Sequence, residues 1–454
     1  MKFELKYKLV LSELTPETRE HVKRDLTMAN PLFNNLVRLD KQTYGTPRQL
    51  YFFEEQGDSL VLPRGSADQV YRICLQHGEE INVIDERRIL PPVSFDSKGN
   101  LKPFQSDAVQ AILPYTHGVL SSGTGSGKTV MALVLIAERK QPTLIIVHTK
   151  ELLHQWVERA GQFLGMDPGE IGIIGNGKFA LGDRVTVGMV QTLCKRVDEV
   201  KDRFGHIVVD ECHRCPSKTF LDVMTAFDAR FLLGLTATAY RRDGLSQVIF
   251  WHLGDRRHEV QKEDLLDQGD LCQAQVVWHR TSFDTVLNAS EQYSRVLSEL
   301  TQDQARNRQI CGDVAAENNP GIKLVLSDRK AHCQELQRIL KEDHGIDAAV
   351  LVGGLSQKAR TAVSEQIRQG KVDVLICTGQ LIGEGYDLPE LSVLFLATPI
   401  KFSGRLIQYV GRILRPSPGK DLAVIHDYAD SKVGVLDHSA KARQQTYQQE
   451  KIAA

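Results

Sequence analysis

The sequence is poor in cysteine and has no long hydrophobic run. Its 454 residues include eight cysteines, at positions 74, 194, 212, 215, 272, 311, 333 and 377. This number is too small for a disulfide scaffold in so long a chain, and it predicts reduced thiols in an intracellular protein. The start, MKFELKYKLV, lacks the apolar core of a signal peptide, and no apolar stretch approaches the roughly 18–20 residues of a membrane span. We therefore expect a cytoplasmic protein that does not enter a membrane.

An excess of either charge is also absent. Lys and Arg number 56 and Asp and Glu 57, which leaves a net charge of -1. A nucleic-acid partner would have to bind a local basic surface, because attraction follows the distribution of charge and not only its sum. Hydrophobic residues make up 42% and charged residues 25% of the chain, which is ordinary for a globular protein and disfavours disordered, collagen-like and rod-like chains. The length predicts two to four domains, at about 100–200 residues each.

Short apolar runs alternate with helical patterns in two stretches of the chain. The first stretch, residues 96–265, holds the strand candidates GVLSS, TLIIVH, RVTVG, HIVVDE and FLLGLTAT, and the second, residues 301–454, holds IKLVLS, AAVLV, DVLICT, SVLFLA and LAVIHDY. Such alternation is typical of parallel sheets buried on both faces. It predicts an α/β fold of two domains in series, joined by a connector at residues 266–300. The polar tail after Tyr428 is expected to fray.

Residues 1–95 are expected to form a small N-terminal α+β domain. The segments LYFFEE and SLVLP, joined by QGD, are predicted to form a β-hairpin within it. A proline pair, Pro91 and Pro92, and the segment SFDSKGN follow, and they favour a linker before the first α/β stretch.

A glycine-rich segment, SGTGSGKT at residues 122–129, stands between the strand candidate GVLSS and the helical run TVMALVLIAER. Glycines let such a loop turn so that its N–H groups face phosphate oxygens, and the following helix points its positive end at the same anion. Lys128 would reach the β- and γ-phosphates of ATP, and the Thr129 hydroxyl would bind Mg²⁺. The alternative is an ordinary glycine-rich turn. The segment predicts a phosphate site formed by Ser122, where the pattern expects Gly or Ala, and by Gly123, Thr124, Gly125, Ser126, Gly127, Lys128 and Thr129.

An acidic pair, Asp210 and Glu211, stands at the end of the strand candidate HIVVDE. A carboxylate at a strand end can hold Mg²⁺, and its neighbour can orient or deprotonate the attacking water. We therefore predict Asp210 as a metal ligand and both carboxylates as catalytic. Alone, such a pair could be an acidic helix cap, but here it accompanies a phosphate loop. Cys212 and Cys215 form a CxxC, yet no second cysteine pair is evident to complete a zinc site.

Three polar residues of the segment SGRLIQYVGRILRP are spaced for one face of a helix. Gln408, Arg412 and Arg415 fall at i, i+4 and i+7, which would stack them on one side. A guanidinium can neutralise charge on a phosphoryl group in transfer, an effect worth on the order of 10³–10⁵ in rate. We predict all three as catalytic, and the alternative is a solvated basic helix face. Because they lie about 280 residues after Lys128, they can complete the site only when two lobes close on ATP.

Taken together, these motifs resemble those of superfamily 2 helicases and translocases, in the family's order, over residues from about 100 to 416. The resemblance implies two tandem RecA-like domains with parallel sheets and an ATP hydrolase that uses ATP and Mg²⁺. The segment KPFQSDA, with Phe104 and Gln105, resembles the adenine-reading segment. LTAT, with Thr236 and Thr238, resembles the motif that couples hydrolysis to movement.

Three further segments resemble the family's other contact motifs. VHTKELLHQW and VGMVQTL resemble segments that contact the nucleic-acid backbone, and TGQLIGEGYDLP resembles the motif that bridges nucleotide and strand. By this resemblance the nucleic-acid-binding residues would be Thr149, Lys150, Gln191, Thr192 and Thr378, and the bridging motif would bring Gly385 and Asp387, with Gly383 and Glu384, to the nucleotide.

Within the superfamily, DECH and LGLTATAYRRDG resemble the XPB-like DNA helicases, with phage branch-migrating helicases such as UvsW and restriction-enzyme motor subunits as relatives. Arg242 and Asp243 resemble part of the XPB Arg-Glu-Asp element, although Glu is missing. The resemblance implies a monomeric DNA helicase or translocase that acts on single-stranded or branched duplex DNA, moves 3′→5′ and has protein partners in repair, recombination or replication. The alternatives are a duplex translocase of a restriction system and a nucleotide-switched DNA-binding scaffold. RNA is a less favoured substrate.

The N-terminal region carries five aromatic residues amid near-balanced charge. Such rings can stack on unpaired bases, or they can fill the hydrophobic side of a small sheet. We favour the second interpretation for most of them. By resemblance to XPB-like relatives, the position of the domain still suggests DNA recognition or substrate selection. The residues concerned are Phe33, Tyr44, Tyr51, Phe52 and Phe53.

Overall fold

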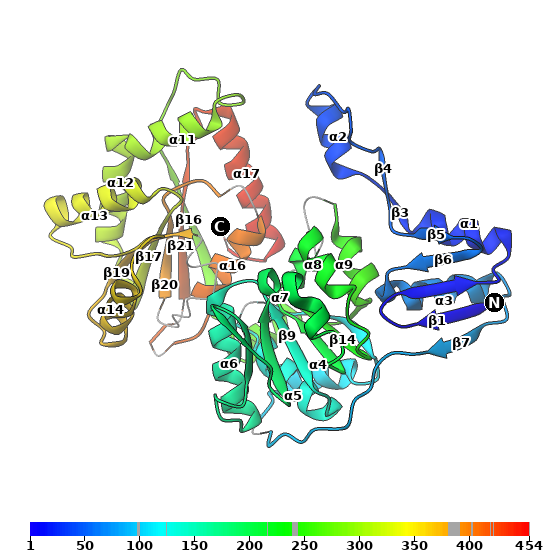
Figure 1. Ribbon diagram of the computed structural model, residues 1–454. Coiled ribbons are helices and arrows are strands. Elements are labelled where there is room, and N and C mark those ends of the chain that lie inside the picture. Colours follow the sequence, from blue (N-terminus) through cyan, green and yellow to red (C-terminus); the bar gives the residue numbers. More distant parts are fainter. Residues whose placement is uncertain are drawn as a thin grey trace. The chain divides into compact units, whose positions relative to one another are not determined.

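A computed structural model describes residues 1–97, 100–123, 125–215, 217–237, 244–379, 391–400, 403–417, 419–420 and 422–453. The chain divides into two units, Met1–Gln261 and Lys262–Ala454 (Figure 1). Each unit holds a parallel sheet with helices packed against it. Within the described ranges, no helix combines the length and apolar character that crossing a membrane requires.

The first unit begins with a five-stranded sheet in the order β5-β6-β2-β1-β7. The predicted hairpin is present, because Glu54 pairs with Val61 and Gln56 with Ser59. Leucines of β2 and β6 and one face of α1 and α3 form the core of this domain, which also includes Trp251 from a later helix. The elements are β1 (Lys2–Leu5), β2 (Leu9–Ser12), α1 (Pro16–Asp25), β5 (Glu54–Gln56), β6 (Ser59–Leu62), the 3₁₀ helix η1 (Arg64–Ser66), α3 (Ala67–Gln76) and β7 (Asn82–Asp85).

Between α1 and β5 the chain leaves this sheet and forms a separate arm, residues 27–51. Its β3 (Thr27–Ala29) and β4 (Gln49–Tyr51) pair only with each other in a two-stranded ribbon, and α2 (Pro31–Arg38) lies between them. The expectation that most of the N-terminal aromatics fill the core is wrong for Tyr44 and Tyr51, which are exposed. Only Phe52 and Phe53, which follow the arm, pack against the core.

The rest of the first unit contains an eight-stranded sheet in the order β11-β10-β12-β9-β13-β14-β8-β15. All neighbours are parallel except β10 and β11. Its central strands are buried along their whole length, which is why they read as continuous apolar runs. The strands are β8 (His117–Ser121), β9 (Thr143–Val147), β10 (Gly172–Gly175), β11 (Lys178–Ala180), β12 (Val185–Met189), β13 (His206–Val209), β14 (Phe231–Thr236) and β15 (Arg256–Glu259).

Helices connect and cover these strands (Figure 1). Thr149, which precedes α6, caps the first turn of that helix. The helices are α4 (Pro103–Ile112), α5 (Lys128–Arg139), α6 (Lys150–Leu164), α7 (Val190–Arg196), η2 (Val197–Glu199), η3 (Cys212–Arg214), α8 (Lys218–Met224) and α9 (Ser246–Leu253). The strand candidates of both halves and the parallel sheets are confirmed.

The second unit contains a six-stranded, all-parallel sheet in the order β16-β21-β20-β17-β19-β18. Part of the expected connector is one of its strands, because β16 pairs along its length with β21. The strands are β16 (Gln273–Arg280), β17 (Ile322–Ser327), β18 (Ala349–Leu351), β19 (Val374–Thr378), β20 (Leu391–Leu396) and β21 (Leu422–Ala429), and the helices are α10 (Lys262–Asp267), α11 (Tyr293–Gln302), α12 (Gln304–Ala316), α13 (Lys330–His344), α14 (Gln357–Arg368), α16 (Ser403–Ile413) and α17 (Gly434–Gln449).

The expectation of a frayed tail is wrong, because residues 434–449 form α17 and pack onto the sheet. The carboxylate of Asp427, fully buried on β21, accepts hydrogen bonds from Arg443 (2.7 Å) and from the Tyr447 hydroxyl (2.9 Å). These are charge-assisted interactions inside a low-dielectric core. Two of the polar side chains of the tail are therefore buried and paired and fix α17 to the sheet, while Gln444, Gln445, Gln448 and Gln449 are exposed.

Candidate functional site

Predicted nucleotide and nucleic-acid residues lie at one edge of the eight-stranded sheet. Its central parallel strands follow in the order β12, β9, β13, β14, β8, and pairs such as Met189 with Val147 bring their carboxyl ends to the same edge. In parallel α/β sheets this is the edge at which ligands bind. In strand order, this edge carries the predicted residues Gln191, Thr149, Asp210, Thr236 and Ser122.

The loop between β8 and α5 is held by hydrogen bonds among its own residues. Gly125 and Gly127 have φ angles of 93° and 80°, in the left-handed region that glycine adopts readily. The Lys128 ammonium donates to the carbonyl oxygens of Ser122 (2.6 Å) and Gly123 (3.0 Å). Lys128 therefore lies against the turn whose N–H groups are predicted to face phosphate.

Ser122, where the phosphate-loop pattern expects Gly or Ala, fits into the loop without disturbing it. Its buried hydroxyl donates to the hydroxyl of Ser126, which itself donates to the Gly123 carbonyl at 2.8 Å. The Ser122 N–H donates to the Thr236 carbonyl at 2.9 Å. The serine thus adds a hydrogen bond inside the loop, and Thr129 follows, half-buried in the first turn of α5.

Phe104 and Gln105 lie in the first turn of α4, and both are buried. The Gln105 side chain donates from Nε2 to the Ser126 carbonyl at 2.9 Å and accepts from the Lys102 N–H at 3.0 Å. A Cβ at Gly127 would lie 2.5 Å from the same Nε2, so only glycine leaves room for the amide. Gln105 therefore connects its predicted adenine-reading segment to the phosphate loop.

Asp210 and Glu211 follow β13 directly, and their two carboxylates differ in environment. Burial raises the pKa of Asp210, to which the negative charge of Glu211 adds, while the Trp156 indole N–H donates to Oδ2 at 2.8 Å and opposes the shift. Burial would also raise the pKa of Glu211, but His213 and Lys128 outweigh it and lower that pKa. The pair therefore consists of one carboxylate held ionised and one whose charge depends on its partners.

His213 connects the acidic pair to the end of β14. Its Nδ1 lies 3.2 Å from Oε2 of Glu211 and 3.3 Å from the hydroxyl of Thr236. Thr236 is fully buried, and its carbonyl accepts from the phosphate loop. The last residue of β14 thus contacts both halves of the predicted hydrolytic site.

The predicted nucleic-acid residues meet because β9 and β12 are neighbours. Thr149 caps α6 by accepting from the Leu152 N–H at 3.2 Å, and exposed Lys150 begins that helix. Gln191, in the first turn of α7, donates to the carbonyl of His148 at 3.0 Å, and Thr192 follows it. The two segments form one polar surface at the carboxyl edge, next to the acidic pair.

Two residues of this region were not predicted from the sequence. Trp156 lies on α6 and donates a hydrogen bond to Asp210. The same helix begins at Lys150, a predicted nucleic-acid residue, and therefore contacts the acidic pair two turns later. Burial lowers the pKa of His148 to about 4. The charges of Arg214, Glu211 and His213 also act on this side chain. Both stand in VHTKELLHQW, but nothing in that segment shows which side chain reaches another strand.

In the second unit, Thr378 ends β19 beside Ser327 of β17 and is half-buried. Gly379 follows it, and a Cβ there would overlap the hydroxyl of Tyr409 on α16. The start of the predicted bridging motif therefore lies against α16, the helix that carries Arg412. Its residues Gly383, Glu384, Gly385 and Asp387 lie outside the described residues, as do Thr124, Thr238, Arg242 and Asp243.

Gln408 and Arg412 lie on α16, but the expectation that Arg415 shares this helix is wrong. α16 ends at Ile413, because Pro416 disfavours helical backbone at the residue before it. Buried Lys420 holds this end, since its ammonium donates to the carbonyls of Leu391 (2.6 Å), Arg415 (2.7 Å) and Ile413. The sequence analysis did not identify Lys420, whose position after a turn gave no sign of this role.

The residues at the carboxyl edge suit a magnesium nucleotide. Mg²⁺ usually binds one or two carboxylates together with substrate phosphates, and Asp210 and Thr129 supply a carboxylate and a hydroxyl of that kind. Among the described residues there is no group of three or more His, Cys, Asp or Glu placed to hold a metal ion by themselves. Cys212 and Cys215 are fully buried in the core beneath η3.

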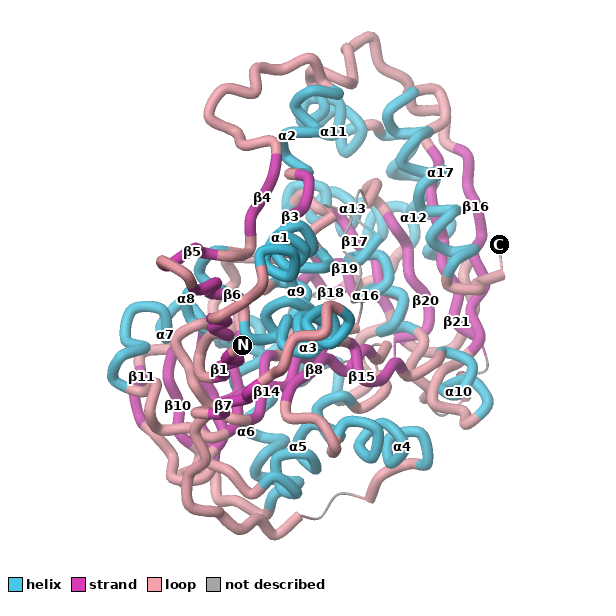
Figure 2. The backbone as a smooth tube through the Cα atoms, turned by 90° about the vertical axis from the view of Figure 1, so that its right-hand side faces the viewer, coloured by secondary structure: helices cyan, strands magenta, loops and turns pink. Residues whose placement is uncertain are grey.

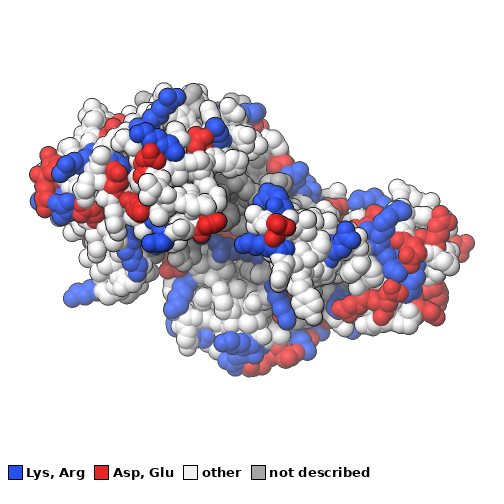
Figure 3. All heavy atoms as spheres, turned by 90° about the horizontal axis from the view of Figure 1, so that it is seen from above, with Lys and Arg blue, Asp and Glu red and all other residues white. Residues whose placement is uncertain are grey.

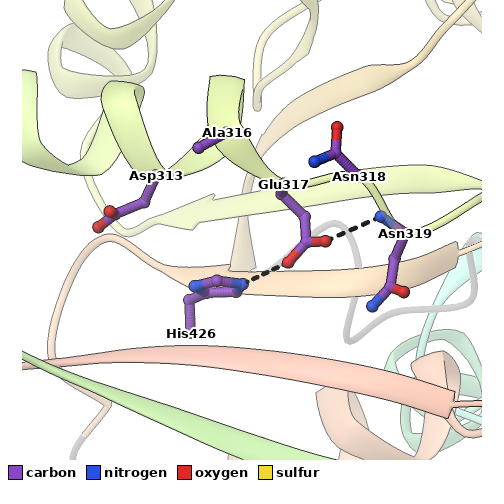
Figure 4. A pocket seen from close by; sticks show the side chains of 6 residues that line it. All are labelled: Asp313, Ala316, Glu317, Asn318, Asn319 and His426. Carbon is purple, nitrogen blue, oxygen red and sulfur yellow. Dashed lines mark hydrogen bonds and ion pairs between the residues drawn. The ribbon is translucent and has the colours of Figure 1, made fainter.

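Two further surface features of the described residues are the distribution of charge and one cavity. Basic and acidic side chains are interspersed over the face that Figure 3 shows. A cavity of about 330 Å³ lies between α12 and β21 in the second unit (Figure 4). There Glu317 accepts from Asn319 N–H at 2.8 Å and pairs with His426 at 2.8 Å. Its carboxylate and imidazole satisfy each other, and none of the predicted site residues lines it.

A phosphate loop and an acidic pair at the carboxyl edge of one parallel sheet, followed by a second parallel α/β unit with an arginine segment, define a nucleotide-hydrolysing motor protein. Two family models match the chain, "Type III restriction enzyme, res subunit" over residues 98–241 and "Helicase conserved C-terminal domain" over residues 306–417. The chain thus contains both helicase domains, and together they support an ATP-dependent helicase of superfamily 2.

Relatives agree with this assignment, and a solved structure shares the fold. The Escherichia phage T5 protein "Probable helicase D10" is 27% identical over 66% of this chain and 65% of its own length, so the match spans slightly less than two thirds of that relative. "DNA 3'-5' translocase XPB2" of Sulfurisphaera tokodaii is 25% identical over 76% of this chain and 84% of its own. The structure of S. cerevisiae Dbp5 bound to RNA and ADP BeF3 shares the fold, with a TM-score of 0.53, 17% identity and coverage of 75% and 86%.

Proposed function

We propose that this protein is an ATP-dependent DNA helicase or translocase that moves 3′→5′ along DNA or remodels branched DNA. The observation that carries the proposal is the carboxyl edge of the first sheet, where the nucleotide residues and the nucleic-acid candidates stand on adjacent strands. The hydrogen bond from Trp156 to Asp210 connects the two groups. Because α6 contacts both groups of residues, a change at the acidic pair during ATP hydrolysis can be transmitted through this helix to the bound DNA strand.

Each residue has a defined role in this proposal. Lys128 neutralises the β- and γ-phosphates, while Asp210 and Thr129 hold Mg²⁺, which supplies positive charge to the transferring phosphoryl group. Glu211 orients the attacking water. Arg412 and Arg415, with Gln408, complete the site when the two motor domains close, and Thr149, Lys150, Gln191, Thr192 and Thr378 contact the DNA backbone.

The relatives support DNA as the substrate and this polarity, since one of them is named as a DNA 3'-5' translocase. The match to a restriction-enzyme subunit favours a second candidate, a duplex translocase that moves without separating strands. Unwinding of forked and four-way DNA, compared with displacement of a protein roadblock from blunt duplex, distinguishes the two. We place the protein among the factors that act on repair or recombination intermediates.

The decisive experiment replaces Lys128 with alanine. ATP hydrolysis by the wild-type protein should rise on addition of single-stranded DNA, and Lys128→Ala should lose this stimulated activity while keeping its circular dichroism spectrum. Lys178→Ala, at an exposed lysine of the edge strand β11, is the matched control and should hydrolyse like wild type. Normal turnover by Lys128→Ala would overturn the proposal. Stronger stimulation by RNA than by DNA would reassign the substrate, and DNA binding without turnover would indicate a scaffold.

A further inference from the structure

The arm of residues 27–51 carries its side chains outside any hydrophobic core. No residue of α2 is buried, and Figures 1 and 2 both show this helix at the end of the β3–β4 ribbon, away from the five-stranded sheet. Of the thirteen exposed large hydrophobic side chains among the described residues, five belong to these 25 residues, with Tyr44 fully exposed. A concentration of this kind marks a binding surface. The five are Leu32, Val37, Leu39, Tyr44 and Tyr51.

The base of the arm is nonetheless fixed. Asn30 is buried, its side chain donates to the Pro47 carbonyl at 2.8 Å, and it accepts from the Leu32 N–H at 3.0 Å. Its own N–H donates to the Arg48 carbonyl at 2.9 Å. Both ends of the intervening segment are thereby joined, so the arm presents its exposed side chains from a defined root.

The base of the arm packs against the domain that contains the eight-stranded sheet. Phe52, which follows β4, contacts the Trp251 ring of α9 at a centroid distance of 4.8 Å. Pro31, at the start of α2, lies beside Gly244, where a Cβ would approach it to 3.3 Å. Gly244 stands between the end of β14 and the start of α9. The arm is therefore anchored where the chain leaves the carboxyl edge that carries the predicted nucleic-acid residues.

Charge distinguishes the arm from the sheet that supports it. Its basic residues are Arg38, Lys41 and Arg48, against a single acidic residue, Asp40. None of these three cations forms an ion pair within the part of the chain that the structure describes. Five basic residues of the neighbouring sheet region and α1 are instead paired with carboxylates, as Lys2–Glu13, Lys6–Glu86, Lys8–Glu54, Arg19–Glu55 and Lys23–Glu55.

From this combination we infer that the arm binds DNA at an unpaired base. The Tyr44 ring stacks on a base exposed at a junction, and Arg38, Lys41 and Arg48 contact the flanking phosphates. Exposed aromatic rings interleaved with cations that have no carboxylate partner suit single-stranded nucleic acid, since each base offers a face and each nucleotide a negative charge. Basic side chains of a protein partner would have only Asp40 of the arm with which to form an ion pair. This inference rests on the proposed DNA motor function and assigns the arm as the part that selects branched over linear DNA.

The test measures binding of the full-length protein to a fork with an unpaired gap and to blunt duplex, by fluorescence anisotropy. Tyr44→Ala should weaken fork binding by about tenfold, the loss of one base stacked on an aromatic ring, while Tyr44→Phe keeps wild-type affinity. Blunt-duplex binding should not change. Tyr7→Ala, at another exposed tyrosine of the same domain, is the matched control. Equal fork binding by Tyr44→Ala and wild type would overturn the inference.

Salt dependence tests the cations separately. The double variant Arg38→Ala, Lys41→Ala should reduce the slope of log affinity against log salt by about 1–1.5, since each phosphate contact on a single strand contributes about 0.7. Lys2→Ala with Lys6→Ala removes two lysines that are already paired with carboxylates and should leave the slope unchanged. Equal slopes in the two double variants would also contradict the inference.

Two further readouts separate the arm from the motor. ATP hydrolysis stimulated by linear single-stranded DNA should be the same in Tyr44→Ala and wild type. If DNA does not stimulate ATP hydrolysis by the wild-type protein, the proposed function fails. If stimulation is normal and Tyr44→Ala binds the fork as tightly as wild type, only the inference about the arm fails. Sedimentation of wild type should show no association that Tyr44→Ala abolishes. A dimer lost in that variant would assign the surface to a second copy of the chain and overturn DNA as its occupant.

Discussion

Glu211 adopts a left-handed backbone conformation, with φ 51° and ψ 48°. For a residue with a Cβ this geometry costs on the order of 1–3 kcal/mol and persists only where surrounding contacts impose it. Here the Glu211 N–H donates to its neighbour's Oδ1 at 2.9 Å, and His213 lies at its carboxylate. The turn directs two adjacent carboxylates to different partners, so that Asp210 accepts from Trp156 and Glu211 pairs with His213.

Trp156 provides a test at this scale. Trp156→Phe keeps the buried ring but removes the hydrogen bond to Asp210, worth about 1–1.5 kcal/mol. We expect kcat for DNA-stimulated ATP hydrolysis to fall about five- to tenfold, with little change in KM for ATP. The measurement is steady-state hydrolysis at saturating DNA.

Trp278→Phe is the matched control for this change. Trp278 is half-buried, and its indole N–H has no hydrogen-bond partner among the described residues. Its replacement should therefore leave hydrolysis unchanged. If Trp156→Phe and Trp278→Phe turn over alike, Trp156 does not act through Asp210.

Among the secondary structure elements, α16 depends on a residue that lies outside it. The carbonyl groups at the end of a helix have no partners within the helix, and the buried Lys420 ammonium supplies hydrogen bonds to Ile413 and, beyond it, to Arg415. Burial lowers the pKa of Lys420 to about 8. The charged group is kept because it satisfies three carbonyl oxygens at once, one of them on Arg415, which is predicted to be catalytic.

We therefore predict that Lys420→Met both destabilises the second unit and slows hydrolysis. Loss of these hydrogen bonds should reduce the free energy of unfolding by about 1–3 kcal/mol. It should reduce kcat more than it raises KM for ATP, because Arg415 loses its fixed position. Urea denaturation and steady-state kinetics measure the two effects.

Lys432→Met, at an exposed lysine of the same unit, is the control and should match wild type in both assays. A destabilised Lys420→Met that hydrolyses ATP at the wild-type rate would show that Lys420 serves the fold alone.

Across the whole molecule, buried histidines link stability to pH. Burial lowers the pKa of His117 to about 4 and that of His332 to about 3, and it lowers the pKa of His206 well below its usual value. Unfolded histidine titrates near 6.5. Below that pH the unfolded chain binds protons that the folded chain does not, so stability falls as pH decreases.

The expected result is a loss of about 1–3 kcal/mol per buried histidine as pH falls from 6.5 toward 4, with no comparable change between pH 7 and 8. Thermal unfolding midpoints across this range measure it. His438→Gln, at an exposed histidine, should leave the profile unchanged. A midpoint that stays constant down to pH 4.5 would contradict the assignment of these three side chains as neutral.

Much of this architecture could be predicted from local patterns. Continuous apolar runs located the central strands of both sheets, because a strand buried on both faces consists mostly of apolar residues. Glycine spacing located the phosphate loop for a similarly local reason, the positive φ angles at Gly125 and Gly127. The helical tail was missed because Arg443 and Tyr447 read as solvent-exposed residues, and only their pairing with Asp427 makes their burial favourable.

By itself, the sequence determined the order of strands, loops and motifs along the chain, because each depends on residues a few positions apart. Only the tertiary structure decided which of them meet. The neighbourhood of β9 and β12 brings Thr149 beside Gln191, and the packing of α6 brings Trp156 to Asp210. Lys420 and the exposed Tyr44 likewise owe their roles to burial and exposure. Such contacts join residues far apart in the chain, and no local spacing encodes them.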